Sequence, residues 1–167
     1  NATADPNCAN NVSLYQVKHL DDSLTWDRAN QYCTINYGTE LATIYNNGTT
    51  VTPQTPLQQW DEISRLTTSM PAGSNSWMGL RYEVSENAYS YVRGEWASGN
   101  RLPLNGQIFS TIFDEAPNDG QDCIMVYRSQ CDAVTGVCEW NNKSCETIGT
   151  NPVSSLICNT PSYCGDG

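Results

Sequence analysis

The first forty residues carry a strand pattern followed by a helix pattern. Apolar and polar positions roughly alternate over residues 14–20, which predicts a strand. The polar residues at 21–23 offer groups that begin helices, so we expect a helix after them. Trp26, Ala29 and Cys33 then recur at helical spacing, which predicts that they face the core. Gly38 is placed to end this helix.

A second helix follows a predicted surface loop. Leu41, Ala42 and Ile44 indicate a buried connection. Residues 45–59 contain two prolines and polar residues, which favours a loop. Apolar positions three and four residues apart then predict a helix ended by a proline and a glycine: Trp60, Ile63, Leu66 and Met70, before Pro71 and Gly73.

The remainder of the chain has the pattern of short strands. We expect strands over residues 76–84, 89–96, 123–129, 140–145 and 154–160, separated by turns. Residues 97–122 are rich in turn-forming and acidic residues and predict an irregular region. Two early helices followed by a run of strands favour an α+β domain over an alternating parallel sheet.

Length and charge limit the domain count and the possible partners. With 167 residues, 38% of them hydrophobic and 10% aromatic, the chain can form one core. We expect an N-terminal extension over 1–13, one domain over 14–160 and a tail over 161–167. The formal net charge of −10 argues against nucleic acid and an anionic membrane surface as partners. No segment has the roughly 20 apolar residues that span a bilayer, so we expect no membrane insertion.

The cysteines and glycosylation sequons favour a secreted protein. Eight cysteines can pair in about 105 ways, and their spacing alone selects none of them. Zinc is the alternative, but the separations are wider than in usual zinc motifs and His19, the only histidine, lies far away in the sequence. Asn-x-Ser/Thr sequons begin at four positions: Asn1, Asn11, Asn47 and Asn142. The polar start at Asn1 suggests a processed, mature chain.

Several motifs in order resemble the C-type lectin-like family. The segment 24–44, with its tryptophan, alanine, cysteine and Leu-Ala-x-Ile exit, is similar to the opening helix of that family. Residues 77–80, Trp-Met-Gly-Leu, resemble its central Trp-Ile-Gly-Leu motif. Later matches to its proline loop, its two cysteine strands and its closing strand are Pro117-Asn118, Asp122-Cys123, Trp140-Asn141-Asn142, Ser144-Cys145 and Leu156-Ile157-Cys158. The resemblance implies a C-type lectin-like fold, with two helices packed on small antiparallel sheets, a long irregular loop region and stabilising disulfides.

The resemblance also implies two disulfides, Cys33–Cys158 and Cys123–Cys145. Cys131 and Cys138 flank a short glycine-containing turn, so we expect a bridge across that hairpin. Cys8 and Cys164 would then join the two terminal segments, tethering the extension and the tail.

The ligand positions implied by the resemblance have lost acidic groups. Members of the family that bind sugar do so through a calcium ion, which prefers about 6 to 8 oxygen ligands, carboxylates among them. Here the proline loop gives Ala116, Pro117 and Asn118, and Gln121 stands for a glutamate. Asn141 and Asn142 stand for the Asn-Asp pair, while Glu115 could shift into the empty place. We therefore expect the calcium-dependent sugar site to be impaired, and a glycan on Asn142 would cover it.

A second calcium position is implied by Glu86, Asp119 and Asp122, which match an auxiliary site in some relatives. Calcium is accordingly a possible cofactor at this acidic loop, since a cation would relieve the repulsion between carboxylates. The alternative is that the loop is only a solvated acidic segment.

For function, the sequence favours a non-catalytic extracellular binding module over an enzyme. His19 has no evident serine or cysteine nucleophile beside it, and the adjacent acids Asp114 and Glu115 do not suit a facing glycosidase pair. One interpretation is recognition of a glycan or an extracellular protein by residues 97–122 and 140–142. Aromatic residues available for sugar stacking are Tyr89, Tyr91, Trp96 and Trp140, although we expect Trp77 and Trp140 to fill the core. The alternative is a self-associating structural subunit of an extracellular coat, filament or complex.

Overall fold

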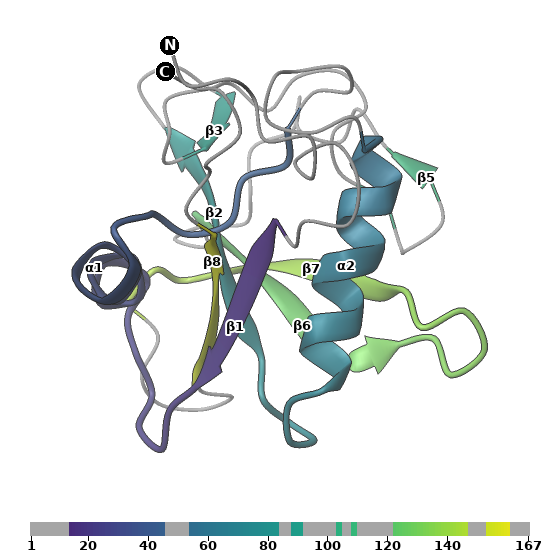
Figure 1. The fold of residues 1–167 in the computed structure, drawn as a ribbon, viewed down its shortest axis with the longest axis horizontal. Helices are drawn as coiled ribbons and strands as arrows, with labels where there is room; N and C mark the ends of the chain where they lie inside the picture. The colour runs from purple at the N-terminus through teal and green to yellow at the C-terminus, as the bar shows by residue number, and fades with distance from the viewer. Residues whose placement is uncertain are drawn as a thin grey trace, which may run out of the picture.

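The computed structural model describes residues 14–45, 54–83, 88–91, 103–104, 108–109, 122–146 and 153–160. The expected extension 1–13 and tail 161–167 lie outside these ranges, as do Cys8 and Cys164. In chain order the elements are β1 (Tyr15–His19), α1 (Trp26–Tyr37), α2 (Pro56–Thr68), β2 (Ser76–Glu83), β3 (Ala88–Tyr91), β4 (Pro103–Leu104), β5 (Ile108–Phe109), β6 (Cys123–Cys131), β7 (Cys138–Lys143) and β8 (Ser155–Asn159) (Figure 1).

The main sheet confirms the α+β class and is mixed. Its order is β1-β8-β2-β6-β7, with β3 paired to the outer part of β2, and β4 and β5 form a separate hairpin. Most neighbours are antiparallel, as expected, but β2 and β8 run parallel, with Ser76 opposite Ser155. This parallel pair was not predictable from the residue pattern, because the two strands lie far apart along the chain.

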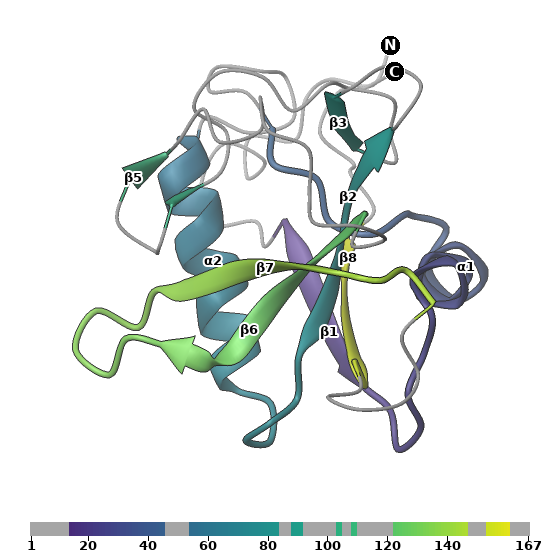
Figure 2. The ribbon, with the colours of Figure 1, turned by 180° about the vertical axis from the view of Figure 1, so that it is seen from behind.

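Each face of the sheet is covered by a helix. Met78 and Leu80 of β2 pack with Trp60 and Ile63 of α2 in one cluster. Trp77 packs on the opposite side with residues of α1 in a second cluster. Successive residues of a strand point to opposite faces, so this alternation places α2 and α1 on the two sides of the sheet. Figures 1 and 2 show the two helices on either side of the strands.

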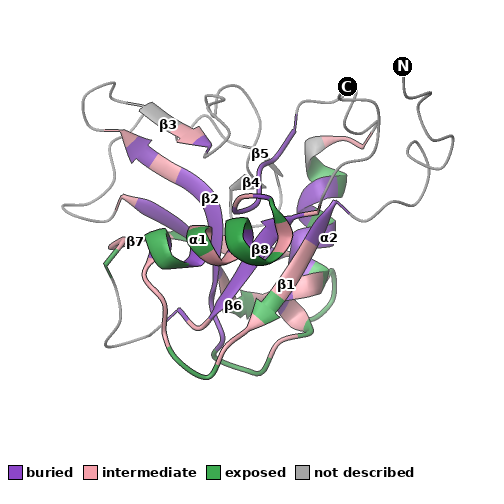
Figure 3. Ribbon diagram, turned by 60° about the vertical axis from the view of Figure 1, so that its left-hand side comes forward, coloured by how far each residue is buried: buried purple, intermediate pink, exposed green. Residues whose placement is uncertain are grey.

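Burial on both faces explains the apolar strand sequences. All five residues of β8 and the first four of β6 are buried, and Figure 3 shows these strands among the buried parts of the chain. A strand covered on one face only would alternate with polar residues.

Helix α1 begins later than predicted. Its N-cap is Thr25, whose hydroxyl accepts from Arg28 N at 3.3 Å, so the expectation of a start at residues 21–23 was wrong. The reason is tertiary: Leu20 N and Leu24 N donate to Ser154 O and Val153 O, which keeps this segment out of the helix. The helix end is as predicted, with Gly38 at a φ of 70°.

Helix α2 begins earlier than predicted, so residues 56–59 are helical and not part of a loop. Thr55 and Gln58 form a capping box, and Pro56 occupies the first turn, where its missing N–H costs nothing. The helix ends at Thr68 with Ser69 as its C-cap, so Met70 lies outside it.

The connection after α1 is buried, as expected, and it lies between β2 and β8. Ala42 N donates to Ile157 O, and Gly79 N donates to Ala42 O, each at 2.9 Å. No helix in the described ranges is long and apolar enough to cross a membrane.

Candidate functional site

The β6–β7 hairpin is cross-linked at both ends. Cys131–Cys138 closes its loop, and Cys123–Cys145 joins the other end, where the chain leaves β7. With Cys33–Cys158, which joins α1 to β8, these are the three pairings that the sequence led us to expect among the described cysteines. The zinc alternative is therefore wrong for these six cysteines.

Two of the predicted ligand residues lie near the open end of this hairpin, close to Cys123 and Lys143. Asn141 is opposite Met125 and Asn142 is opposite Ile124 in the pairing with β6. Asn141 is exposed and Asn142 is half-buried. Because both ends of β7 are fixed covalently, the backbone carrying these two amides has little freedom to move.

Of the predicted metal residues, Asp122 alone falls in the described ranges. It directly precedes β6, and its carbonyl accepts from Tyr82 N at 2.7 Å. Cys123 is opposite Lys143, which follows Asn142 in β7, so Asp122 lies at the same end of the hairpin as Asn142. Glu86, Glu115, Pro117, Asn118, Asp119 and Gln121 lie outside the described ranges, as do the sequons at Asn1, Asn11 and Asn47.

The described part of this site offers two neutral amides, the ammonium group of Lys143 and, at the end of the hairpin, the carboxylate of Asp122. Partial burial lowers the pKa of Lys143, since desolvation disfavours the charged form of the ammonium. Within the described residues, no group of three or more His, Cys, Asp or Glu side chains could hold a metal ion. The arrangement at Asn141 and Asn142 can therefore donate and accept hydrogen bonds without bringing negative charge.

The aromatic residues proposed for sugar stacking are less accessible than expected. Tyr91 is buried, so the expectation that it is available to a ligand was wrong. Its pairing with Leu80 places it against the core beneath β2. Trp77 is fully buried, as predicted, whereas Trp140 is only partly buried at the edge of its cluster. Trp96 and the side chain of Tyr89 are outside the described part.

The environment of His19 also differs from the expectation. Two serine hydroxyls lie within reach of its Nδ1, Ser155 at 2.9 Å and Ser74 at 3.4 Å. The sequence did not place them there because β8 and the segment before β2 meet β1 only in the folded sheet. Ser155 is fully buried, so this contact packs the sheet and does not face a substrate.

The β6–β7 loop contains the glycine-containing turn expected from the sequence, and hydrogen bonds to Asp132 that were not expected hold it in shape. Asp132 accepts from Val134 N and from the Thr135 hydroxyl, each at 2.9 Å. These bonds hold the pKa of Asp132 below its ordinary value, the Val134 amide making the larger contribution. Gly136 takes a φ of 75°, and Val134 is 92% exposed at the tip. The Asp-x-x-Thr-Gly spacing between two cysteines was the available signal.

Comparison with solved structures shows the same fold at low sequence identity. Human lithostathine superposes with a TM-score of 0.58 at 18% identity, with 95% of this chain and 100% of that chain covered. The C-type lectin domain of murine dendritic cell inhibitory receptor 2, solved in complex with N-glycan, gives a TM-score of 0.57 at 12% identity, with coverage of 95% and 100%.

Comparison with sequences gives a family match and no individual relative. A search of curated proteins found no match. The family model for the lectin C-type domain matches residues 22–160, which is most of the chain. The protein therefore belongs to the C-type lectin domain family.

Proposed function

We propose that this chain is an extracellular, non-catalytic recognition module that binds a glycan or a protein ligand without the family's calcium-dependent sugar site. Three disulfides among the described residues suit an oxidising compartment. The net charge of −10 makes nucleic acid and anionic membranes unfavourable ligands.

The observation that carries this proposal is the pair of neutral amides on β7. Asn141 matches an asparagine of the family motif, whereas Asn142 stands where the family has an aspartate. Calcium affinity rises with the number of charged ligands, so the loss of that carboxylate should lower it strongly. Asn141 and Asn142 lie on a strand fixed at both ends by disulfides. A rigid exposed amide can instead form hydrogen bonds directly to a ligand at low entropic cost.

A glycan is the ligand class with the most support. The murine receptor domain, which shares the fold, was solved in complex with N-glycan. Trp140, which directly precedes the two amides on β7, is only partly buried. If the sequon at Asn142 is glycosylated, that glycan covers the same surface, and peptide mass spectrometry of the secreted protein would detect it.

The direct test is a glycan array probed with the purified chain, once with calcium and once with a chelator. We expect the same glycans to be retained in both conditions. Retention that disappears with the chelator would contradict the calcium-independent site. A blank array in both conditions would remove glycans as the ligand and leave an extracellular protein, to be sought by pull-down with the intact chain.

A further inference from the structure

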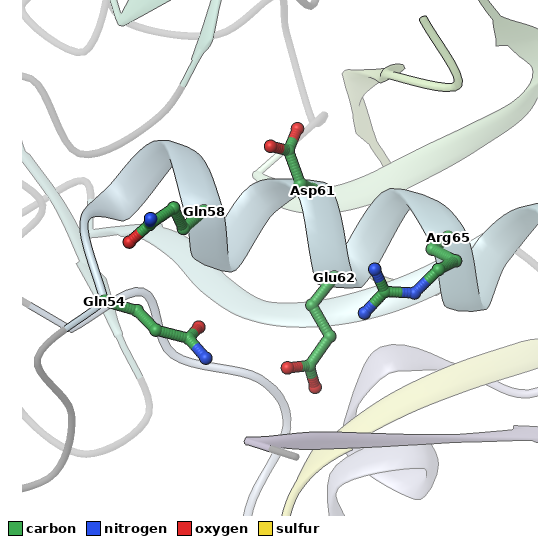
Figure 4. Close-up of a pocket in the computed structure, with 5 residues that line it drawn as sticks. All are labelled: Gln54, Gln58, Asp61, Glu62 and Arg65. Carbon is green, nitrogen blue, oxygen red and sulfur yellow. The ribbon is translucent and has the colours of Figure 1, made fainter. Parts of the chain in front are cut away.

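A shallow depression lies beside α2, on the other side of the sheet from α1. Its volume is about 290 Å³, near the lower end of the roughly 300 to 1,000 Å³ that is usual for small-molecule sites. The five side chains that line it are all polar: Gln54, Gln58, Asp61, Glu62 and Arg65 (Figure 4). A ligand for this depression must therefore be polar and small.

The helix brings four of these side chains together. Gln58, Asp61, Glu62 and Arg65 are separated by three and four positions, which places them along one side of α2. Gln54 joins them from the segment just before the helix, as Figure 4 shows.

The floor of the depression is rigid. Glu62 is only 7% exposed, and its carboxylate accepts from Tyr15 N at 2.9 Å and from Leu14 N at 3.4 Å. The Gln58 carbonyl oxygen accepts from Thr55 N at 2.8 Å in the capping box, which leaves the Gln58 NH₂ group able to donate. The depression is therefore held in shape before any ligand arrives, which reduces the entropic cost of binding.

The exposed groups at the rim include one hydrogen-bond donor and one hydrogen-bond acceptor. Arg65 and Asp61 are exposed, and no ion pair within the described ranges engages Arg65 although Asp61 lies four positions before it. The guanidinium is a forked donor and the carboxylate is an acceptor. A hydroxyl group both donates and accepts, so neighbouring hydroxyls match this rim.

The charge and arrangement of the lining argue against an anion, a cation or an apolar group as the ligand. Two carboxylates and one guanidinium leave the lining with an excess negative charge, which disfavours anions. In Figure 4 the side chains of the adjacent residues Asp61 and Glu62 point away from each other, so their carboxylates do not converge on one cation. Because no apolar side chain lines the depression, an apolar peptide side chain would gain little there.

We propose that this depression binds one neutral sugar residue of a glycan, at a place separate from β7. The inference rests on the proposed function, that the chain recognises glycans, and it names a second surface that contacts them. A site this open binds a single sugar weakly, in the millimolar range, and contributes to affinity when a longer glycan also contacts β7.

The test is an NMR titration of the intact, ¹⁵N-labelled chain with neutral methyl glycosides of mannose, galactose and N-acetylglucosamine, in the presence of a chelator. We expect at least one glycoside to cause saturable shifts of the Gln58 side-chain NH₂ and the Arg65 Nε–H. Arg65→Gln and Asp61→Asn each remove one hydrogen-bonding charge and should weaken that binding by roughly tenfold. Neither residue supports the capping box, so the fold is retained.

The matched control is Arg28→Gln, which removes the same kind of charge from the exposed side of α1 and should leave the titration unchanged. Equal weakening by Arg28→Gln would show a general charge effect and overturn the site. Shifts confined to β7 would overturn the α2 site and leave the proposed function standing. Titrations that shift no resonance with any glycoside would also overturn the site, and the glycan array then decides the proposed function separately.

Discussion

Among the glycines in the described ranges, Gly79 of β2 is predicted to be the one at which an added methyl group destabilises the fold most. Residues 41–44 cross β2 here, and Gly79 N donates to Ala42 O at 2.9 Å. A Cβ atom at position 79 would lie 2.7 Å from Leu41 C and 2.8 Å from Ala42 O, and it would be closer still to Leu41 O. These neighbours are backbone atoms, and the hydrogen bond from Ala42 N to Ile157 O of β8 fixes their position, so they cannot shift to make room.

The cost of Gly79→Ala follows from these contacts. Overpacking a tightly packed core costs roughly 1–3 kcal/mol. Loss of the hydrogen bond to Ala42 adds about 1 kcal/mol. We therefore expect the free energy of unfolding to fall by about 2–4 kcal/mol. Gly79 is not among the positive-φ glycines of the described chain, so none of this cost comes from a left-handed backbone conformation.

Gly38→Ala provides the matched comparison. At Gly38 a Cβ atom would meet nothing within 4 Å, but the φ of 70° is unfavourable for a residue with a side chain. That conformational cost is about 1–2 kcal/mol.

The assay is urea unfolding with intact disulfides, followed by tryptophan fluorescence and analysed by linear extrapolation. The predicted order of stability is wild type, then Gly38→Ala, then Gly79→Ala. The claim is that position 79 requires glycine because the backbone of residues 41 and 42 lies so close. A Gly79→Ala variant at least as stable as Gly38→Ala would refute it.

Three further predictions follow from the described contacts. Replacing both Cys33 and Cys158 with alanine removes a cross-link between positions separated by 125 residues. The loop-entropy relation predicts that the free energy of unfolding in urea falls by about 5 kcal/mol. A fall of less than about 1 kcal/mol would contradict this prediction. Glu62→Gln keeps the size of the side chain but replaces one accepting oxygen by an NH₂ group, so one of the hydrogen bonds from Leu14 N and Tyr15 N is lost. Unfolding stability should fall by roughly 1.5–3 kcal/mol and amide exchange at the start of β1 should accelerate. Unchanged exchange would count against this role. Thr135→Ala removes a hydroxyl that donates to Asp132, so the pKa of Asp132 should rise toward its ordinary value. Carboxyl ¹³C NMR measures this pKa, and an unchanged value would contradict the turn geometry. Because folding lowers the pKa of Asp132, its stabilising effect is present above the unfolded pKa and is lost as the pH falls through the folded pKa.

Periodic features of the fold were predictable from the sequence. The inward positions Trp26, Ala29 and Cys33 and the C-terminal Gly38 follow from helical spacing and from the left-handed conformation that glycine tolerates. The long apolar strands were also recognisable, because burial on both faces leaves a nearly continuous apolar run.

Features set by distant contacts were not predictable. The start of α1 at Trp26 depends on hydrogen bonds from Leu20 and Leu24 to residues preceding β8. The parallel pairing of β2 with β8 has the same non-local origin. In β3 the sequence Tyr-Ser-Tyr gives no indication of which face meets the core, so the burial of Tyr91 had to come from the structure.

At the candidate site, the sequence identified residue types and the fold arranged them. Motif positions indicated Asn141, Asn142 and Asp122, and the β6–β7 register brings all three to one hairpin. The polar face of α2 was not predictable in the same way, because the prolines before Trp60 favour a loop and hide the helical spacing from Gln58 to Arg65.

The central claim is that β7 recognises its ligand without holding calcium. The most direct test is a calcium titration of the ¹⁵N-labelled chain, in which NMR follows the side-chain amides of Asn141 and Asn142. The account predicts that both resonances stay in place, even if calcium shifts signals near Asp119 and Asp122. A saturable calcium-dependent shift of both asparagine amides would contradict it, because it would mean that Asn141 and Asn142 hold the metal without the aspartate that the family has at the second position.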